Sequence, residues 1–189
     1  DDMDPETGLD DFVDQVAAAG VGVFYLHSRK AWLSGLSPKE NRDIPPLDYG
    51  RAVRLAGRRR DLAIVLNGGL DNLAAVGEMA PEFAGVMLGR AAYRTPYILA
   101  EIAETLFGRA APTRAAIAGL MADYADRMTV TGTRLHSITR HMLGLYAGQR
   151  GARYWRRQLG EEARLAPDAG AFIRAASDQC RLLATHIAA

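Results

Sequence analysis

The sequence predicts an α/β fold with a parallel sheet, followed by an all-helical segment. Three apolar runs, at residues 21–26, 62–66 and 83–88, have the length and composition of buried strands. Helical patterns separate these runs, and such an alternation is typical of right-handed βαβ units. After Gly108 only helical periodicity remains, so the sheet is confined to the first part of the chain.

Four helices are expected around the predicted strands. The side chain of Asp48 suits the first position of a helix, and proline is tolerated in a first helical turn, as at Pro96. Gly20 and Gly108 follow helical patterns and are expected to end them. The expected helices cover, in order, residues 9–17, 48–60, 72–79 and 95–107.

The segment after Gly108 has three apolar stripes at helical spacing, which predicts a helical bundle. We therefore expect two domains, residues 1–108 and 109–189, with a boundary near residues 108–112. The stripes consist of Ile117, Leu120, Met121, Tyr124 and Met128, then Leu135, Ile138, Met142, Leu145 and Tyr146, and then Phe172, Ile173, Ala176, Cys180, Leu183 and Ile187.

The net charge of +1 conceals a strong asymmetry along the 189 residues. Residues 1–20 hold seven acids and no base, whereas residues 127–160 hold seven arginines, two histidines and no acid. A stretch of one sign attracts a polyanion whatever the total charge is. Arginine is far commoner than lysine, which indicates either recognition chemistry or a GC-rich genome.

Composition also bears on membrane, metal and redox roles. No apolar run approaches the ~20 residues that a membrane-spanning helix needs. The single cysteine, Cys180, cannot form an internal disulfide and fits a reducing compartment such as the cytoplasm. Cys180 lies on an apolar stripe, so we expect a small buried hydrophobe and not a nucleophile. His136 and His141 are five residues apart, and we expect no metal site.

Polar and glycine-rich residues follow each predicted strand. His27 ends the first, Asn67, Gly68 and Gly69 end the second, and the third is followed by Gly89 and Arg90. In (β/α)₈ barrels the loops after the last strands commonly bind a phosphate, because glycines let main-chain N–H groups approach it. The alternatives are simple tight turns and a His27 whose ring hydrogen-bonds to a carbonyl.

An arginine-rich segment, GQRGARYWRRQL, is the second candidate site. Arg153, Arg156 and Arg157 are three or four residues apart, so they cluster on one side of a helix. No acid interrupts the segment, which favours contact with a polyanion over a merely solvated basic face.

The stretch HSRKAWLSGLSPKENRDIPPLDY, with LNGGL, GVMLGRAAYRTPYILAEI and ITRHMLGLYAGQRGARYWRRQL after it, resembles the flavin-dependent tRNA-dihydrouridine synthases, most closely their A subfamily. The resemblance implies a TIM barrel that carries FMN, followed by a helical tRNA-binding domain. It also implies that NADPH reduces the flavin, which passes hydride to C6 of a D-loop uridine flipped out of the tRNA, at positions 20 and 20a. A cysteine then protonates C5. The full-length form is expected to be a monomer.

By this resemblance, His27, Asn67, Gly68, Gly69, Gly89 and Arg90 would bind FMN. Arg153 and Arg156 match positions expected to contact tRNA, with Arg157, Arg29, Lys30 and Lys39 as further candidates.

The chain departs from the family pattern because no proton-donating cysteine in an Asn-x-x-Cys-Pro context is present. That residue is expected upstream of Asp1, so no catalytic residue is assigned and the isolated chain is expected to be inactive. The chain would then supply about strands six to eight of the barrel. Two alternatives are a non-catalytic tRNA-binding fragment and another FMN-dependent barrel reductase of a small molecule.

Overall fold

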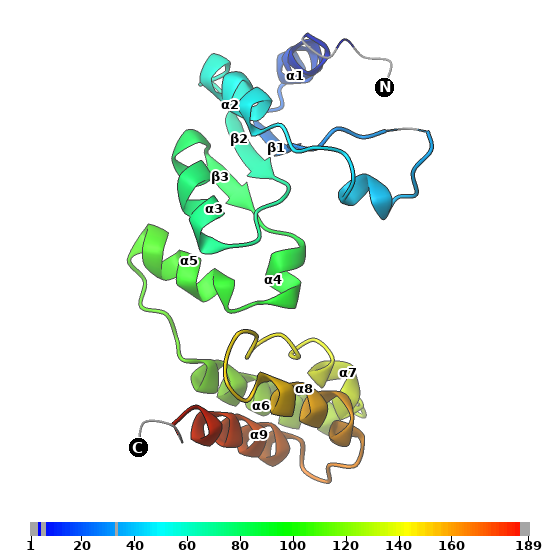
Figure 1. The fold of residues 1–189 in the computed structure, drawn as a ribbon, viewed down its shortest axis with the longest axis vertical. Helices are drawn as coiled ribbons and strands as arrows, with labels where there is room; N and C mark the ends of the chain where they lie inside the picture. Colours follow the sequence, from blue (N-terminus) through cyan, green and yellow to red (C-terminus); the bar gives the residue numbers. More distant parts are fainter. Residues whose placement is uncertain (1–3, 5–6, 33, 186–189) are drawn as a thin grey trace. The chain divides into compact units, whose positions relative to one another are not determined.

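The computed structural model describes residues 4, 7–32 and 34–185, and the chain divides into two compact units, residues 1–89 and 90–189 (Figure 1). Ile187 and Asp1 lie outside the described residues. The domain boundary expected near residues 108–112 falls within the second unit, between two of its helices, and stays a prediction. None of the described helices combines the length and apolarity needed to cross a bilayer.

The first unit is built on a parallel sheet with the strand order β1-β2-β3. Its strands are β1 (Val23–His27), β2 (Ala63–Asn67) and β3 (Gly85–Met87). The helices α1 (Gly8–Ala18), α2 (Tyr49–Arg58) and α3 (Leu73–Met79) alternate with the strands, and short 3₁₀ turns lie at Glu40–Arg42 and Ala80–Glu82. The predicted order of strands and helices is thus confirmed for this unit.

Two helix starts follow directly from local sequence. The carboxylate of Asp48 accepts a hydrogen bond from the N–H of Arg51 at 2.8 Å, and Asn72 accepts one from the N–H of Ala75 at 2.9 Å. Each satisfies a main-chain donor that the first turn of a helix would otherwise leave unpaired. The starts of α2 and α3 are therefore specified by the local sequence.

The sheet is covered on one face only, which corrects the expectation that residues 21–26 form a buried strand. Val13 of α1 and Leu55 of α2 are buried against Ile64 of β2. On the other face, Val23 and Tyr25 of β1 are 54% and 67% exposed. β1 is an edge strand, and no described element of its unit covers that face. This arrangement is consistent with part of a TIM barrel, whose helices lie outside and whose other face turns inward.

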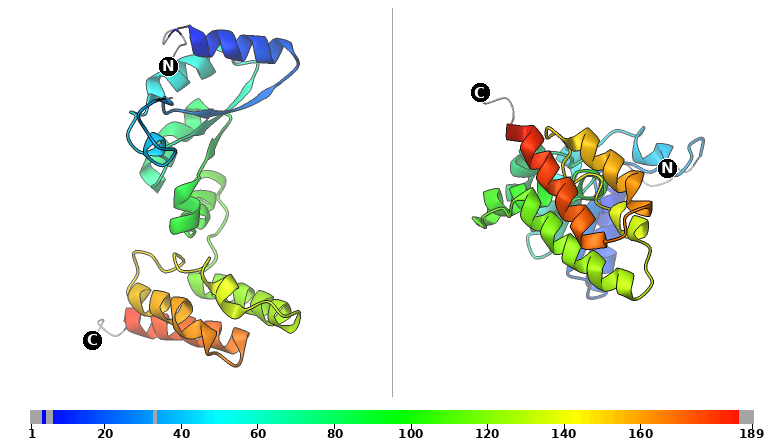
Figure 2. Two further views of the ribbon diagram at one scale, coloured as in Figure 1. Left: turned by 90° about the vertical axis from the view of Figure 1, so that its right-hand side faces the viewer. Right: turned by 90° about the horizontal axis from the view of Figure 1, so that it is seen from below.

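The second unit consists of helices in the residues that the structure describes. They are α4 (Arg90–Arg94), α5 (Ile98–Phe107), α6 (Arg114–Val130), α7 (Leu135–Thr139), α8 (Ala152–Gly160) and α9 (Ala169–Thr185), with a 3₁₀ turn at Glu162–Arg164. α5 ends at Gly108, whose φ of 62° is the left-handed conformation that glycine adopts easily. Figure 2 shows α6, α8 and α9 lying side by side.

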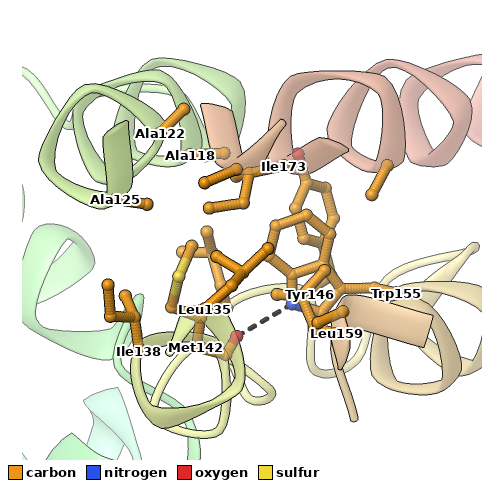
Figure 3. Close-up of a cluster of buried hydrophobic side chains, with 14 of the residues drawn as sticks. Ala118, Ala122, Ala125, Leu135, Ile138, Met142, Tyr146, Trp155, Leu159 and Ile173 are labelled. Atoms are coloured by element: carbon orange, nitrogen blue, oxygen red, sulfur yellow. Dashed lines mark hydrogen bonds between the residues drawn. The ribbon is translucent and has the colours of Figure 1, made fainter. Parts of the chain in front are cut away.

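The core of the second unit forms where α6 and α9 approach closely. Alanines at positions 118, 122 and 125 of α6 are fully buried, and their small side chains admit Ile173 of α9. Trp155 of α8 is also fully buried, and its indole N–H donates to the Met142 carbonyl at 2.8 Å (Figure 3). The tilted rings of Tyr146 and Trp155 have centroids 4.7 Å apart.

The periodicity of the apolar stripe over residues 135–146 predicts one continuous helix, and this prediction is wrong. α7 ends at Thr139, and turns and bends continue to Gly151, directly before α8. Gly144 lies so close to the main-chain carbonyl of Arg94 that a side chain at 144 would collide with it. The Met142 and Leu145 carbonyls accept bonds from Trp155 and Arg114 side chains, so tertiary contacts replace helical hydrogen bonds here.

Candidate functional site

The first candidate site lies at the C-terminal edge of the sheet. His27 pairs in register with Asn67, and Asn67 pairs with Met87. Because the strands are parallel and in register at this end, the segments after all three leave from the same edge. The structure thereby brings together His27, Asn67 and the Gly68-Gly69 pair.

His27 is an exposed residue at the end of β1, with one ring nitrogen already engaged. The main-chain N–H of Arg29 donates to His27 Nδ1 at 3.2 Å. In a neutral imidazole this assigns the proton to Nε2, which is then a hydrogen-bond donor.

Asn67 joins the first two strand ends through its main chain. Its carbonyl accepts bonds from Ser28 N at 2.8 Å and from Ser28 Oγ at 3.1 Å. Ser28 is 6% exposed, and sequence reasoning missed it because a serine after a strand carries no specific signal. The side-chain amide of Asn67 has no partner among the described residues, so it keeps its hydrogen-bonding capacity for a ligand.

The glycine pair after β2 is required by both conformation and packing. Gly68 and Gly69 have φ values of 108° and 71°, in the left-handed region that favours glycine. A Cβ on Gly68 would lie 3.0 Å from His27 Cε1, and one on Gly69 would lie 2.7 Å from the Tyr49 hydroxyl. That hydroxyl donates to the Gly68 carbonyl at 2.8 Å. Burial, reinforced by the charge of Asp71, raises the pKa of Tyr49, so the hydroxyl remains a donor.

Gly89 and Arg90 follow β3. A Cβ built on Gly89 would meet nothing within 4 Å, so this glycine is not required by packing within the chain. The space that a side chain at residue 89 would occupy is therefore open to a ligand. Arg90 is exposed and begins α4, in the second unit. The role of Arg90 stays a prediction.

The segment between β1 and α2, apart from residue 33, is a loop whose two ends are paired. Arg29 and Leu47 form an antiparallel bridge, and the Arg29 guanidinium donates to the carbonyls of Asp43, at 3.1 Å, and of Pro45. This arginine therefore holds the loop together in addition to any external role. Lys30 and Lys39 are exposed on the same loop.

Asn41 closes the loop and was not singled out by the sequence. Its Oδ1 accepts from the Trp32 N–H at 2.8 Å, and its Nδ2 donates to the Trp32 carbonyl at 2.6 Å. These bonds join two parts of the loop that carries Lys30 and Lys39.

The second candidate site is the exposed side of α8. Trp155 and Leu159 are fully buried, so they fix which side of α8 faces the core. Arg153, Arg156 and Arg157 are exposed, and none has an ion-pair partner among the described residues. This side, the arginine face, can neutralise an external anion without first breaking an internal ion pair.

The remaining titratable candidate, Cys180, is inert. It is 1% exposed, and burial raises the pKa of its thiol to about 11, so little thiolate is present near neutral pH. The sulfur lies 3.6 Å from the Gly151 carbonyl, to which the S–H donates. Within the described residues no cluster of three or more His, Cys, Asp or Glu side chains could hold a metal.

Comparison with known proteins identifies a consistent set of relatives. The sequence model of the dihydrouridine synthase (Dus) family matches residues 1–179. A tRNA-dihydrouridine(20/20a) synthase of Shewanella oneidensis is 46% identical over 165 residues, covering 86% of this chain and 49% of that protein. Proteins of the same name from Salmonella typhimurium and Escherichia coli K12 are 45% and 44% identical over 188 residues, covering 97% of this chain and 55% and 53% of theirs. The chain spans about half the length of these relatives.

Proposed function

The chain belongs to the dihydrouridine synthase family, and from this premise we propose that it is part of a tRNA-dihydrouridine synthase of the 20/20a type. The observation that carries the proposal is the register of the sheet, which sets His27 beside Asn67 and the Gly68-Gly69 turn. The substrate would be a uridine of the tRNA D-loop. The named relatives support the substrate, and the strand ends support the cofactor site.

The strand ends fit FMN by the chemistry of their donors. The Asn67 amide and the N–H groups of a glycine turn are donors for a phosphate, and His27 lies beside them at the end of β1. The open space at Gly89 admits a ligand. When bound, FMN supplies hydride transfer, with NADPH as its reductant. This chain's residues would bind and orient it.

The arginine face of α8 supports the tRNA part of the proposal. Its three guanidinium groups are exposed, and residues 127–160 contain no acid. Lys30 and Lys39, on the loop after β1, would add contacts from the first unit. A small-molecule reductase needs no such surface, which disfavours that alternative.

The isolated 189-residue chain is expected to lack synthase activity. Protonation of the uracil C5 needs an accessible acid of suitable pKa. The chain's one cysteine is buried, and its thiol pKa is raised to about 11. A non-catalytic, tRNA-binding role of this chain is therefore the second candidate function, and the exposed arginine face favours it.

Titration with FMN, followed by flavin fluorescence, tests the cofactor site. We expect saturable binding that Asn67→Ala weakens by about tenfold, the effect of losing one good hydrogen bond to a charged group. Gln15→Ala, on the exposed side of α1, is the control and should leave binding unchanged. A chain that binds tRNA but not FMN would favour the second candidate, whereas dihydrouridine formation by the purified chain would contradict its expected inactivity.

A further inference from the structure

A hollow of about 580 Å³ lies in the second unit, and none of its lining residues belongs to α8, the helix that carries the arginine face. Its wall is formed by the end of α6, the start of α7, the 3₁₀ turn and the start of α9. The volume lies within the range of about 300–1,000 Å³ that is usual for small-ligand sites. Its polar side chains are Thr129, Arg134, His136 and Arg164.

The charge of the hollow is of one sign. Two arginines and a histidine line it, and no Asp or Glu is among the lining residues. Neither the side chain of Arg134 nor that of Arg164 has an ion-pair or hydrogen-bond partner in the part of the chain that the structure describes. The hydroxyl of Thr129 donates to carbonyls of its own helix, at 2.9 Å to Ala125. The guanidinium groups are therefore available to an external acceptor.

Glu161 and Glu162 precede the lining residues Ala163 and Arg164, but both are exposed and neither lines the hollow. The nearby carboxylates of Asp126 and Asp168 are engaged elsewhere. Asp126 Oδ1 accepts from the Gly170 N–H at 2.6 Å, and Oδ2 lies 3.5 Å from Arg174 Nη1. Asp168 Oδ1 accepts from the Ala171 N–H at 2.8 Å. Both are thus bound to the start of α9, and neither neutralises Arg134 or Arg164.

From these observations we propose that the hollow between α6, α7 and α9 binds a phosphodiester group of the bound tRNA through Arg134, Arg164 and His136. Paired guanidinium groups are well matched to phosphate oxygens, and a half-buried imidazole adds a further donor. RNA is favoured as the source of the phosphate because the same unit carries the arginine face. This inference rests on the proposed tRNA substrate, which names the source of the phosphate, whereas the chemistry of the site requires only a phosphate.

The test uses the 189-residue chain and its His136 Cε1–H resonance in proton NMR, assigned by comparison with His136→Gln. The probes are a tRNA transcript and inorganic phosphate. We expect both to shift the resonance, and we expect Arg134→Ala/Arg164→Ala to abolish both shifts. The double variant should also reduce the slope of log affinity for tRNA against log salt by about 2, one for each lost contact.

The matched control is Arg109→Ala/Arg181→Ala, which removes the same charge from exposed positions of the same unit. It should leave the resonance shifts intact, and thermal melts should show that both double variants are folded. If tRNA binds without shifting His136, and the two double variants lose equal affinity, the hollow proposal is overturned while the tRNA substrate stands. If phosphate shifts His136 but tRNA does not bind, the phosphate site stands and the proposed function fails. If phosphate does not shift His136 and tRNA does not bind at all, both proposals are overturned.

Discussion

The imidazole of His27 lies beside Gly68, so closely that a Cβ on residue 68 would come within 3.0 Å of Cε1 and 3.2 Å of Nδ1. The same nitrogen, Nδ1, accepts the Arg29 N–H. The turn after β2 therefore fixes the ring at the end of β1 from one side, and the main chain fixes it from the other. A change at Gly68 should act on the candidate cofactor site through His27.

Gly68→Ala should destabilise the first unit by about 1–3 kcal/mol, because alanine is strained at a φ of 108° and because the new methyl group displaces His27. Urea denaturation followed by circular dichroism measures this loss. The matched control is Gly77→Ala in α3, where a Cβ meets nothing within 4 Å. Alanine favours a helix over glycine by about 1 kcal/mol, so the control should be stabilised. Equal effects of the two substitutions would contradict the proposed constraint.

Trp155→Phe should destabilise the second unit by about 1–3 kcal/mol, since it removes the indole donor from the Met142 carbonyl, which keeps only the Leu145 N–H, and leaves part of a fully buried site unfilled. The control is Trp32→Phe, whose side chain is 39% exposed and whose hydrogen bonds to Asn41 come from the main chain. That change should stay within about 0.5 kcal/mol. Chemical denaturation measures both. The chain has only two tryptophans, so Trp32→Phe also leaves Trp155 as the sole fluorescent reporter of its core.

Local sequence predicts the elements of this chain where local chemistry decides them. Asp48 begins α2 and Gly108 ends α5, as expected, because capping depends on residues within one turn. The three strand runs are confirmed for the same reason, since each is a contiguous apolar segment. The juxtaposition of His27 and Asn67 follows in turn from parallel pairing.

Long-range contacts account for what the sequence could not predict. The stripe over residues 135–146 has helical periodicity, but Gly144 packs against the Arg94 carbonyl, a contact that no periodicity reports. Similarly, Tyr25 lies in an apolar run that predicts a buried strand, but it is 67% exposed because no described element of its unit covers that face of the sheet. Arg29 was expected only as a candidate for tRNA contact, yet its guanidinium donates to carbonyls of the loop. Each of these three features is decided by which parts of the chain, distant in sequence, do or do not pack against the residue.

Asp14→Asn should reduce stability near neutral pH by loosening α1 from α2. Hydrogen bonds from Arg58, at 2.9 Å, and from Arg59 lower the pKa of Asp14 from 3.8 in the folded chain. A carboxylate with a lowered pKa stabilises the fold above its unfolded-state pKa, and this contribution is lost as the pH falls through the folded-state value. The difference between wild type and variant should therefore shrink below about pH 4, near the ordinary pKa of aspartate.

Thermal melts between pH 2 and 7 measure this difference, and added salt should diminish it because the pairs are near the surface. Glu78→Gln on the exposed side of α3 is the control, since Glu78 has no ion-pair partner among the described residues. It should show no comparable loss at pH 7. A difference for Asp14→Asn that stays constant down to pH 2 would show that charge is not its cause.

Arg153→Ala/Arg156→Ala should weaken tRNA binding and flatten its dependence on salt. Each arginine that neutralises a phosphate releases a counterion, so removing two should reduce the slope of log affinity against log salt by about 2. The matched control is Arg153→Lys/Arg156→Lys, which keeps both charges on the arginine face and should keep most of the slope. Trp155 and Leu159 hold α8 to the core from its other side, so neither variant should alter the melting temperature appreciably. Filter binding over a range of salt concentrations measures the slopes, and an unchanged slope in the alanine variant would mean that this face of α8 does not contact phosphates.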